Sequence, residues 1–118
     1  MAKFSRAMRM NSPSDYTRVF RQAKRAAGGG LTVLTVENTV GQPRLGLAIA
    51  KKHLKFAYQR NRLKRIIRAS FRQNQAVFAN IDIVVLSRPD VLKRDSEQIW
   101  SALEKHWLTV AGQWQKKS

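Results

Sequence analysis

The segment from Lys51 to Arg72 constrains this chain most, because it carries nine Lys or Arg residues and no Asp or Glu. Drawn as a helix with about 3.6 residues per turn, it places four apolar side chains on one stripe: Leu63, Ile66, Ile67 and Phe71. The other side carries polar and cationic side chains: Asn61, Lys64, Arg65, Arg68 and Arg72. We therefore expect a helix from about residue 56 to residue 75, with one face in a core and the other presenting positive charge.

This positive charge requires a partner outside the chain. The sequence has 23 basic and 7 acidic residues, a net charge of +16, and no acid between Asn38 and Ile81. A solvated helix usually mixes both signs, since each i,i+4 ion pair contributes about 0.2–0.5 kcal/mol. A cationic strip without such pairs indicates a polyanion, and the forked donors of arginine fit phosphate oxygens. Nucleic acid is the first expectation and an anionic membrane surface the second.

Composition predicts one folded domain, residues 1–118, with residues 1–10 as an extended N-terminal segment. A hydrophobic content of 43% fits a packed core and not a disordered basic tail. The absence of cysteine excludes disulfides, zinc ribbons and thiol chemistry. Apolar runs are too short to span a bilayer, and the N-terminus lacks the apolar core of a signal peptide, so we expect a cytoplasmic protein without a membrane partner.

Local signals predict a helix and two strands before the basic helix. The first helix is expected from Ser12, as its cap, to about Ala26, where Gly28-Gly29-Gly30 would stop it. Strands are expected over residues 31–37 and 44–50, with turn residues between them. On the second strand one face is apolar, and the other carries only small residues: Gly46, Ala48 and Ala50.

After the basic helix we expect a strand and a helix. The nearly all-apolar residues 81–87 suit the middle of a sheet. The last helix begins at a capping box formed by Asp95 and Gln98 and runs to about residue 115. Its apolar stripe is interpreted as core, with a partner or self-association seam as the alternative: Trp100, Leu103, Trp107, Val110 and Trp114. The whole is an α+β sandwich.

The sequence offers little for catalysis by the protein itself. The seven carboxylates are scattered, and no two lie close in sequence as acid–base partners would. His53 and His106 are isolated, and we expect each at the surface or an edge and not as a ligand or base. The glycine triplet is not followed by the Lys-Ser/Thr of a phosphate-binding loop. We expect neither catalytic residues nor a metal site.

Three residues of the first helix allow two interpretations. Tyr16, Val19 and Phe20 form a stripe that suits a core. The two aromatic rings, beside a basic sheet edge, suit stacking on unpaired bases equally well. Composition alone leaves both interpretations open.

The basic segment closely resembles the signature of the bacterial ribonuclease P protein subunit. That family has Lys-Lys at the end of a strand, followed by a helix with the pattern Ala-x-x-Arg-Asn-Arg-x-Lys-Arg-x-x-Arg. Lys51-Lys52 and the run from Ala57 to Arg68 match every specified position. The likeness extends through residues 15–20 and 44–50 and covers nearly the whole domain.

The resemblance implies a two-layer α/β sandwich of order α-β-β-β-α-β-α, like the second domain of ribosomal protein S5. It also implies a left-handed βαβ crossover around the basic helix, an exception to the usual hand. Because the residue pattern supplies only two strands before that helix, we expect the third to come from splitting or extending the region of residues 31–50.

The resemblance also implies a function. In this family the RNA subunit cleaves precursor tRNA at its 5′ leader, and the protein binds both the catalytic RNA and the leader. The holoenzyme requires Mg2+, and no cofactor is expected on the protein alone. We expect one protein per RNA and a monomer when free. The alternative is a ribosomal or other structural RNA-binding protein without a processing role.

Site residues follow by position. The resemblance assigns eight residues to the catalytic RNA: Arg60, Asn61, Arg62, Lys64, Arg65, Arg68, Lys51 and Lys52. It assigns Tyr16 and Phe20 to the leader-binding cleft, although the family often has Phe at the position of Tyr16. Ala48 and Ala50, together with Gly46, are our own inference for the floor of that cleft.

Overall fold

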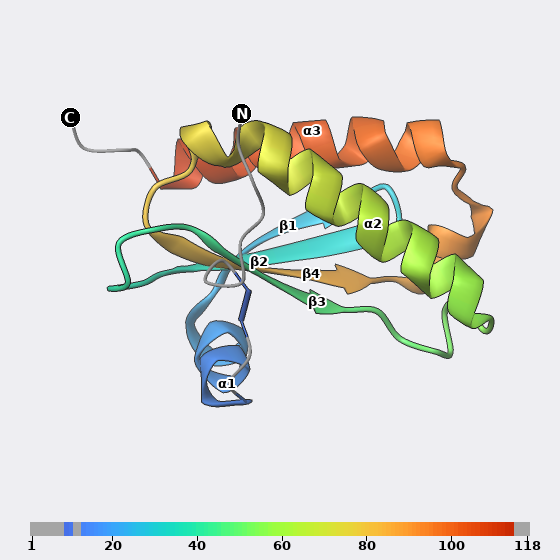
Figure 1. The fold of residues 1–118 in the computed structure, drawn as a ribbon, viewed down its shortest axis with the longest axis horizontal. Helices are drawn as coiled ribbons and strands as arrows, with labels where there is room; N and C mark the ends of the chain where they lie inside the picture. Colours follow the sequence, from blue (N-terminus) through green and yellow to red (C-terminus); the bar gives the residue numbers. More distant parts are fainter. Residues whose placement is uncertain (1–8, 11–12, 115–118) are drawn as a thin grey trace.

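The computed structural model describes residues 9–10 and 13–114 (Figure 1). The helices and strands follow the expected order α-β-β-β-α-β-α: α1 (Pro13–Gln22), β1 (Lys24–Gly28), β2 (Leu31–Glu37), β3 (Arg44–Ala48), α2 (Ala57–Asn74), β4 (Ile81–Ser87) and α3 (Ser96–Gln113). Short 3-10 turns follow α2, at Gln75–Val77, and β4, at Pro89–Lys93.

The four strands form one sheet in the order β1-β2-β4-β3. β2 pairs antiparallel with both β1 and β4, and β3 pairs parallel with β4, so that α2 is the crossover of a βαβ unit. The apolar strand β4 therefore lies inside the sheet, as its composition predicts, and Ile81, Ile83 and Val85 are fully buried.

Two helices cover one face of the sheet, and α1 lies against the other (Figure 1). The main core lies beneath α2 and α3. The stripe predicted for α2 is confirmed, because Leu63, Ile67 and Phe71 are buried in this core and Ile66 packs against it. α2 begins and ends within one residue of the predicted bounds. Burial of this stripe fixes which side of α2 faces solvent.

The prediction for residues 23–30 was wrong. α1 ends at Gln22, and residues 24–26, predicted as the end of that helix, form β1 together with residues 27–28. β1 is the third strand, which was expected from splitting or extending the region of residues 31–50. The glycine triplet is a hairpin turn and not a helix stop, because Gly29 and Gly30 have φ of +63° and +85°, values that suit a tight hairpin. Pairing with all of Leu31–Thr35 outweighs the local helix preference of these residues.

The last helix has the predicted start. Gln98 N donates to Asp95 Oδ1 (2.8 Å), and Asp95 N donates to Gln98 Oε1 (3.0 Å), which forms the capping box. On its stripe Trp107 is buried, and its Nε1 donates to Ser70 Oγ (2.8 Å), while Trp114 Nε1 donates to Thr35 Oγ1 (2.7 Å). The core interpretation therefore holds for these two tryptophans, and Trp100 is half-buried.

Two predictions concern the N-terminal end of the chain. Ser12, the expected cap of α1, lies outside the described residues, as does most of the expected segment 1–10. Within it, Met10 N donates to Leu45 O (3.1 Å), and a parallel bridge joins Arg9 to Leu45 at the edge of β3. Residues 9–10 thus follow the open edge of the sheet.

Candidate nucleic-acid interface

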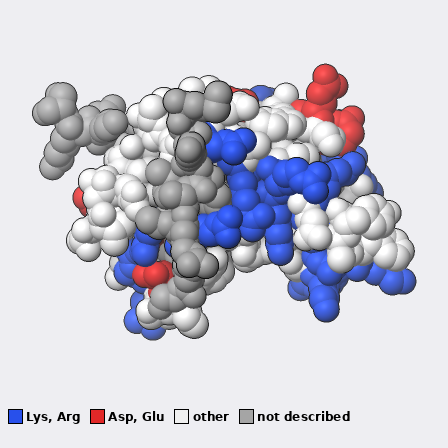
Figure 2. All heavy atoms as spheres, viewed as in Figure 1, with Lys and Arg blue, Asp and Glu red and all other residues white. Residues whose placement is uncertain are grey.

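The solvent-facing side of α2 carries a continuous cationic strip. Asn61, Arg62, Arg65 and Arg72 are exposed, while Lys64 and Arg68 are half-buried. Figure 2 shows blue atoms gathered along α2. None of the ion pairs among the described residues includes a cation of α2. Within that part of the chain, the positive charges of α2 are therefore not neutralised by an acidic side chain.

A hollow of about 480 Å³ lies on the strip towards the C-terminal half of α2. Its lining is cationic or neutral throughout: Arg9, Asn61, Arg65, Arg68, Ala69 and Arg72. Arg68 also lines the groove described below, so the two concave surfaces adjoin along α2. Guanidinium groups around a concave surface can donate to several oxygens of one phosphate backbone.

Arg60 differs from the other cations of the signature. Its Nη1 donates to Leu54 O and to Lys55 O, each at 2.9 Å. The side chain therefore fastens the loop that precedes α2. Arg60 supports the shape of the interface through these bonds, a role that the sequence did not indicate.

Lys51 and Lys52 are exposed in the turn after β3. Ser87, at the end of β4, holds this turn, because its Oγ accepts from Ala50 N (2.9 Å) and lies 2.8 Å from His53 Nδ1. The two lysines thus extend the positive surface of α2 from a turn that is anchored to the sheet. His53 is half-buried at this edge, and its contact with Ser87 helps to hold the turn.

A groove of about 210 Å³ lies where α1, β3 and α2 meet. Tyr16 lines it from α1, Leu45, Gly46 and Leu47 from β3, and Lys64 and Arg68 from α2; Arg9 and Met10 complete it. A Cβ built on Gly46 would lie 2.7 Å from Tyr16 Oη, which is inside contact distance, so only glycine admits this tyrosine. The groove therefore brings one aromatic ring and three cations together: Arg9, Lys64 and Arg68.

The other residues assigned to the cleft lie around this groove. Phe20 is one helical turn beyond Tyr16 and is 51% exposed, and it does not line the groove. Ala48 packs on the same face of the sheet as Tyr16 and Val19. Ala50 lies beyond the end of β3, at the anchored turn. Phe20 and Ala48 thus extend the surface of α1 and β3, while Ala50 belongs to the turn.

A buried carboxylate, missed by the sequence reasoning, holds α1 in place. Asp82 on β4 is fully buried and accepts from Arg44 Nε and Nη2 (2.7 and 2.8 Å) and from Asn38 Nδ2 (2.9 Å). Arg18 of α1 also pairs with it. A lone Asp within an apolar strand is a detectable signal, because buried charges require partners.

The network continues into α1 through a second acid. Arg44 donates from Nη2 and Nη1 to the two carboxylate oxygens of Asp15 (3.2 and 3.4 Å). The hydrogen bonds to Asp82 raise the pKa of Arg44 above its ordinary value, and those to Asp15 add to the effect. Two acids against two arginines tie α1 to β3 and β4, and so set the position of Tyr16.

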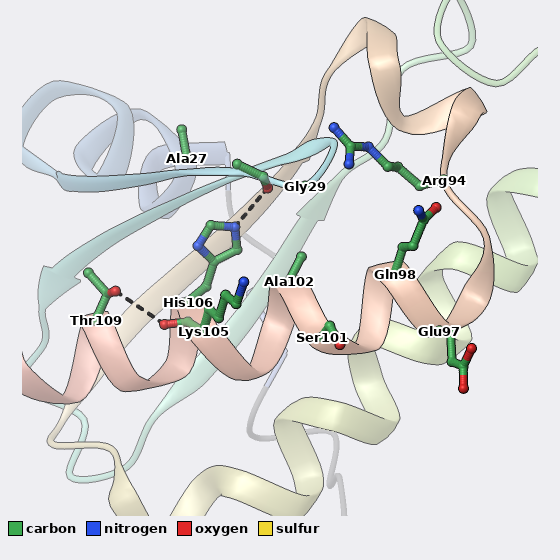
Figure 3. A pocket seen from close by; sticks show the side chains of 11 residues that line it. Ala27, Gly29, Arg94, Glu97, Gln98, Ser101, Ala102, Lys105, His106 and Thr109 are labelled. Carbon is green, nitrogen blue, oxygen red and sulfur yellow. Dashed lines mark hydrogen bonds between the residues drawn. The ribbon is translucent and has the colours of Figure 1, made fainter.

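A further hollow of about 660 Å³ lies between α3 and the β1–β2 turn, and its lining includes no residue of α2 (Figure 3). His106 reaches into it and is buried, with Nε2 2.9 Å from Gly28 O, so the expected surface or edge position was wrong. Through this contact the ring of His106 links α3 to the end of β1. No group of three or more His, Cys, Asp or Glu in the described parts of the chain could hold a metal.

Comparison with known proteins gives one consistent result. The family model described as Ribonuclease P matches residues 4–111. The chain is 44% identical over 104 residues to the "Ribonuclease P protein component" of Pectobacterium atrosepticum, covering 88% of this chain and 87% of that protein. It is 39% identical over 110 residues to the protein of the same name from Nitrosococcus oceani, covering 93% and 92%.

Solved structures agree with the sequence matches. The Staphylococcus aureus RNase P protein superposes with a TM-score of 0.81 at 30% identity, covering 90% of this chain and 96% of that one. The Thermotoga maritima RNase P protein gives 0.71 at 29% identity, covering 88% and 96%. The sheet and helices described above are thus the arrangement found in those proteins.

Proposed function

Since this chain belongs to the ribonuclease P protein family, we propose that it acts in tRNA 5′ maturation by holding two RNAs on adjoining surfaces. Family membership makes it the RNA-binding subunit of a tRNA-processing ribonucleoprotein. The alternative of a structural RNA-binding protein without a processing role is not favoured by these matches.

The array of cations on α2 carries the proposal. Arg62, Arg65 and Arg72 are exposed without an acid partner among the described residues, and the buried stripe prevents the helix from turning them away. We assign this surface, with Asn61 and the two lysines of the turn, to the catalytic RNA. Each phosphate that such a side chain neutralises releases counterions, so the affinity is expected to fall steeply with salt.

The groove at Tyr16 is assigned to the 5′ leader of precursor tRNA. An unpaired leader presents both bases and phosphates, which matches one ring flanked by Lys64 and Arg68. Phe20 and Ala48 would lengthen the track along α1 and β3. The hydroxyl of Tyr16 adds a polar group that Phe at this position would lack.

Cleavage itself is assigned to the RNA subunit, with the Mg2+ that the holoenzyme requires. The described residues offer no carboxylate cluster for the metal, and the best-formed carboxylate site, at Asp82, is saturated by arginines. We further propose one protein per RNA, a monomer when free, and action in the cytoplasm.

Within the described residues, no helix is both long and apolar enough to cross a membrane.

Reconstitution tests the proposal directly. The protein is added to a bacterial ribonuclease P RNA at low magnesium, and cleavage of a precursor tRNA is followed on a gel. We expect the rate to rise and the product to carry the mature 5′ end. An unchanged rate at saturating protein would overturn the proposal.

A further inference from the structure

Two exposed aromatic rings stand together where α2 begins. Phe56 and Tyr58 are 51% and 71% exposed, and their rings are stacked with centroids 5.8 Å apart and planes 12° from parallel. Neither residue lines the groove at Tyr16. Tyr58 precedes Lys64 by six residues, or about 9 Å along the helix, so the pair is a separate surface.

Neither ring belongs to the two buried clusters of the core. Phe56 occupies the N-cap of α2, where Ser, Thr, Asp or Asn would accept a hydrogen bond from the first turn and Phe cannot. Gln59 Oε1 accepts from Phe56 N (3.1 Å), which supports the backbone but not the ring. Aromatic side chains that forgo a cap and face water are typical of a binding surface.

The surroundings specify the chemistry of the partner. Lys55 Nζ lies 5.7 Å from the centroid of the Phe56 ring, and Lys51 and Lys52 are exposed in the turn that leads into it. Arg62 is exposed one turn of helix beyond Tyr58. Figure 2 shows uncharged atoms at the end of the molecule where α2 begins, between groups of Lys and Arg atoms. An apolar protein surface would not require so many cations, whereas an unpaired nucleotide offers a base to the rings and a phosphate to the lysines.

We propose that Phe56 and Tyr58 form a platform on which an unpaired base of RNA stacks, while Lys51, Lys52 and Lys55 bind the adjoining phosphates. This inference rests on the proposed function, because it takes the strip on α2 to face RNA. It adds a second stacking site at the opposite end of that strip from the hollow near Arg72. The base belongs either to the ribonuclease P RNA or to the precursor tRNA, and the experiment below has one arm for each.

The test compares the wild type with Phe56→Leu/Tyr58→Leu, which keeps apolar bulk but removes the rings. The matched control is Phe56→Tyr/Tyr58→Phe, which keeps both rings. Because both side chains are exposed, the variants should unfold at the wild-type urea concentration. Dissociation constants are measured at several salt concentrations, first for ribonuclease P RNA alone and then for precursor tRNA with the assembled holoenzyme.

We expect the leucine variant to bind about 5- to 100-fold more weakly in one of the two arms, as for the loss of one stacked base, while the control binds normally. The salt dependence should keep the wild-type slope, because no phosphate contact is lost. If the leucine variant binds both RNAs with wild-type affinity, the platform is overturned while the proposed function stands. If the wild-type protein itself neither binds the RNA nor raises cleavage, the proposed function fails instead.

Discussion

The arginines of this protein form two groups that differ in their partners. Arg18 of α1 and Arg44 of β3 are both paired with Asp82, which is fully buried. Arg62, Arg65 and Arg72 on α2 are exposed and have no acid partner in the part of the chain that the structure describes. The same side chain therefore serves the fold in one place and is left for a partner in the other. The presence of a carboxylate within reach separates the two roles better than the local density of positive charge.

The paired group also affects the surface beside the unpaired group. The paired group fixes α1, and α1 carries Tyr16 to the groove whose other wall is formed by Lys64 and Arg68 of α2. The fold should thus survive changes that affect only charge on α2, whereas damage to the paired group should disturb both the fold and the groove. Four predictions test this division.

The largest effect is expected for Asp82→Asn. The change keeps the shape of the side chain but leaves Arg44, whose side chain is 15% exposed, without its main counter-charge. We expect a loss of about 3 kcal/mol in the free energy of unfolding, measured in urea. The exposed carboxylate of Glu97 provides the control, because Glu97→Gln should leave stability nearly unchanged. Equal stability of both variants would mean that the paired group does not hold the fold.

Gly46→Ala should disturb the groove through shape alone. Gly46 has an ordinary backbone conformation, so the obstacle to a methyl group is the Tyr16 hydroxyl, which would lie 2.7 Å from the added carbon. We expect a loss of about 1–3 kcal/mol in stability and weaker binding of precursor tRNA with a long leader. Gly112→Ala is the matched control on α3, where no described atom lies within 4 Å of the added carbon, and it should be neutral or stabilising. If Gly46→Ala behaves like Gly112→Ala, the ring of Tyr16 is not fixed by this contact.

The sequence indicates α2 and its polarity because a period of about 3.6 residues separates apolar from cationic positions there. It also indicates β4 and the capping box at Asp95, where the signals are local. It misleads at residues 23–30, since Ala26 and Ala27 favour helix locally and only pairing with β2 makes them a strand. No local pattern could show that pairing.

The residues of the candidate site likewise differ in how far the sequence alone indicates their roles. The solvent-facing cations of α2 could be predicted, because their spacing separates them from the apolar stripe. The assignment of Tyr16 to a binding groove rests on the resemblance, since residue types alone suit a core and a stacking surface equally well. The roles of Arg60 and Asp82 could not be predicted, since both depend on atoms that the fold brings close: the carbonyls of Leu54 and Lys55 for the first, and Arg18 and Arg44 for the second. Charge alone would have placed Arg60 and Arg44 with the unpaired group.

Tyr16→Ala and Phe20→Ala should separate the groove from its surroundings. Loss of the Tyr16 ring should weaken binding of a long-leader precursor by about 1–3 kcal/mol, with little effect on a leaderless tRNA. Phe20 lies outside the groove, so Phe20→Ala should weaken binding of the long-leader precursor less than Tyr16→Ala does. Binding constants with the assembled holoenzyme measure both. Equal losses with and without the leader would show that these rings serve only the packing of α1.

Arg65→Ala should cause the smallest change and isolate the unpaired group. The side chain is exposed and pairs with no acid of the described residues, so the free energy of unfolding should stay within about 0.5 kcal/mol of the wild type. Affinity for ribonuclease P RNA should fall, and the slope of log K against log salt should become shallower by about 0.7–0.9 for each lost phosphate contact. Arg25, exposed on β1 away from α2, is the control, and Arg25→Ala should keep the wild-type slope. An unchanged slope for Arg65→Ala would place that side chain outside the interface. A loss of stability would show that Arg65 supports the fold, as the arginines of the paired group do.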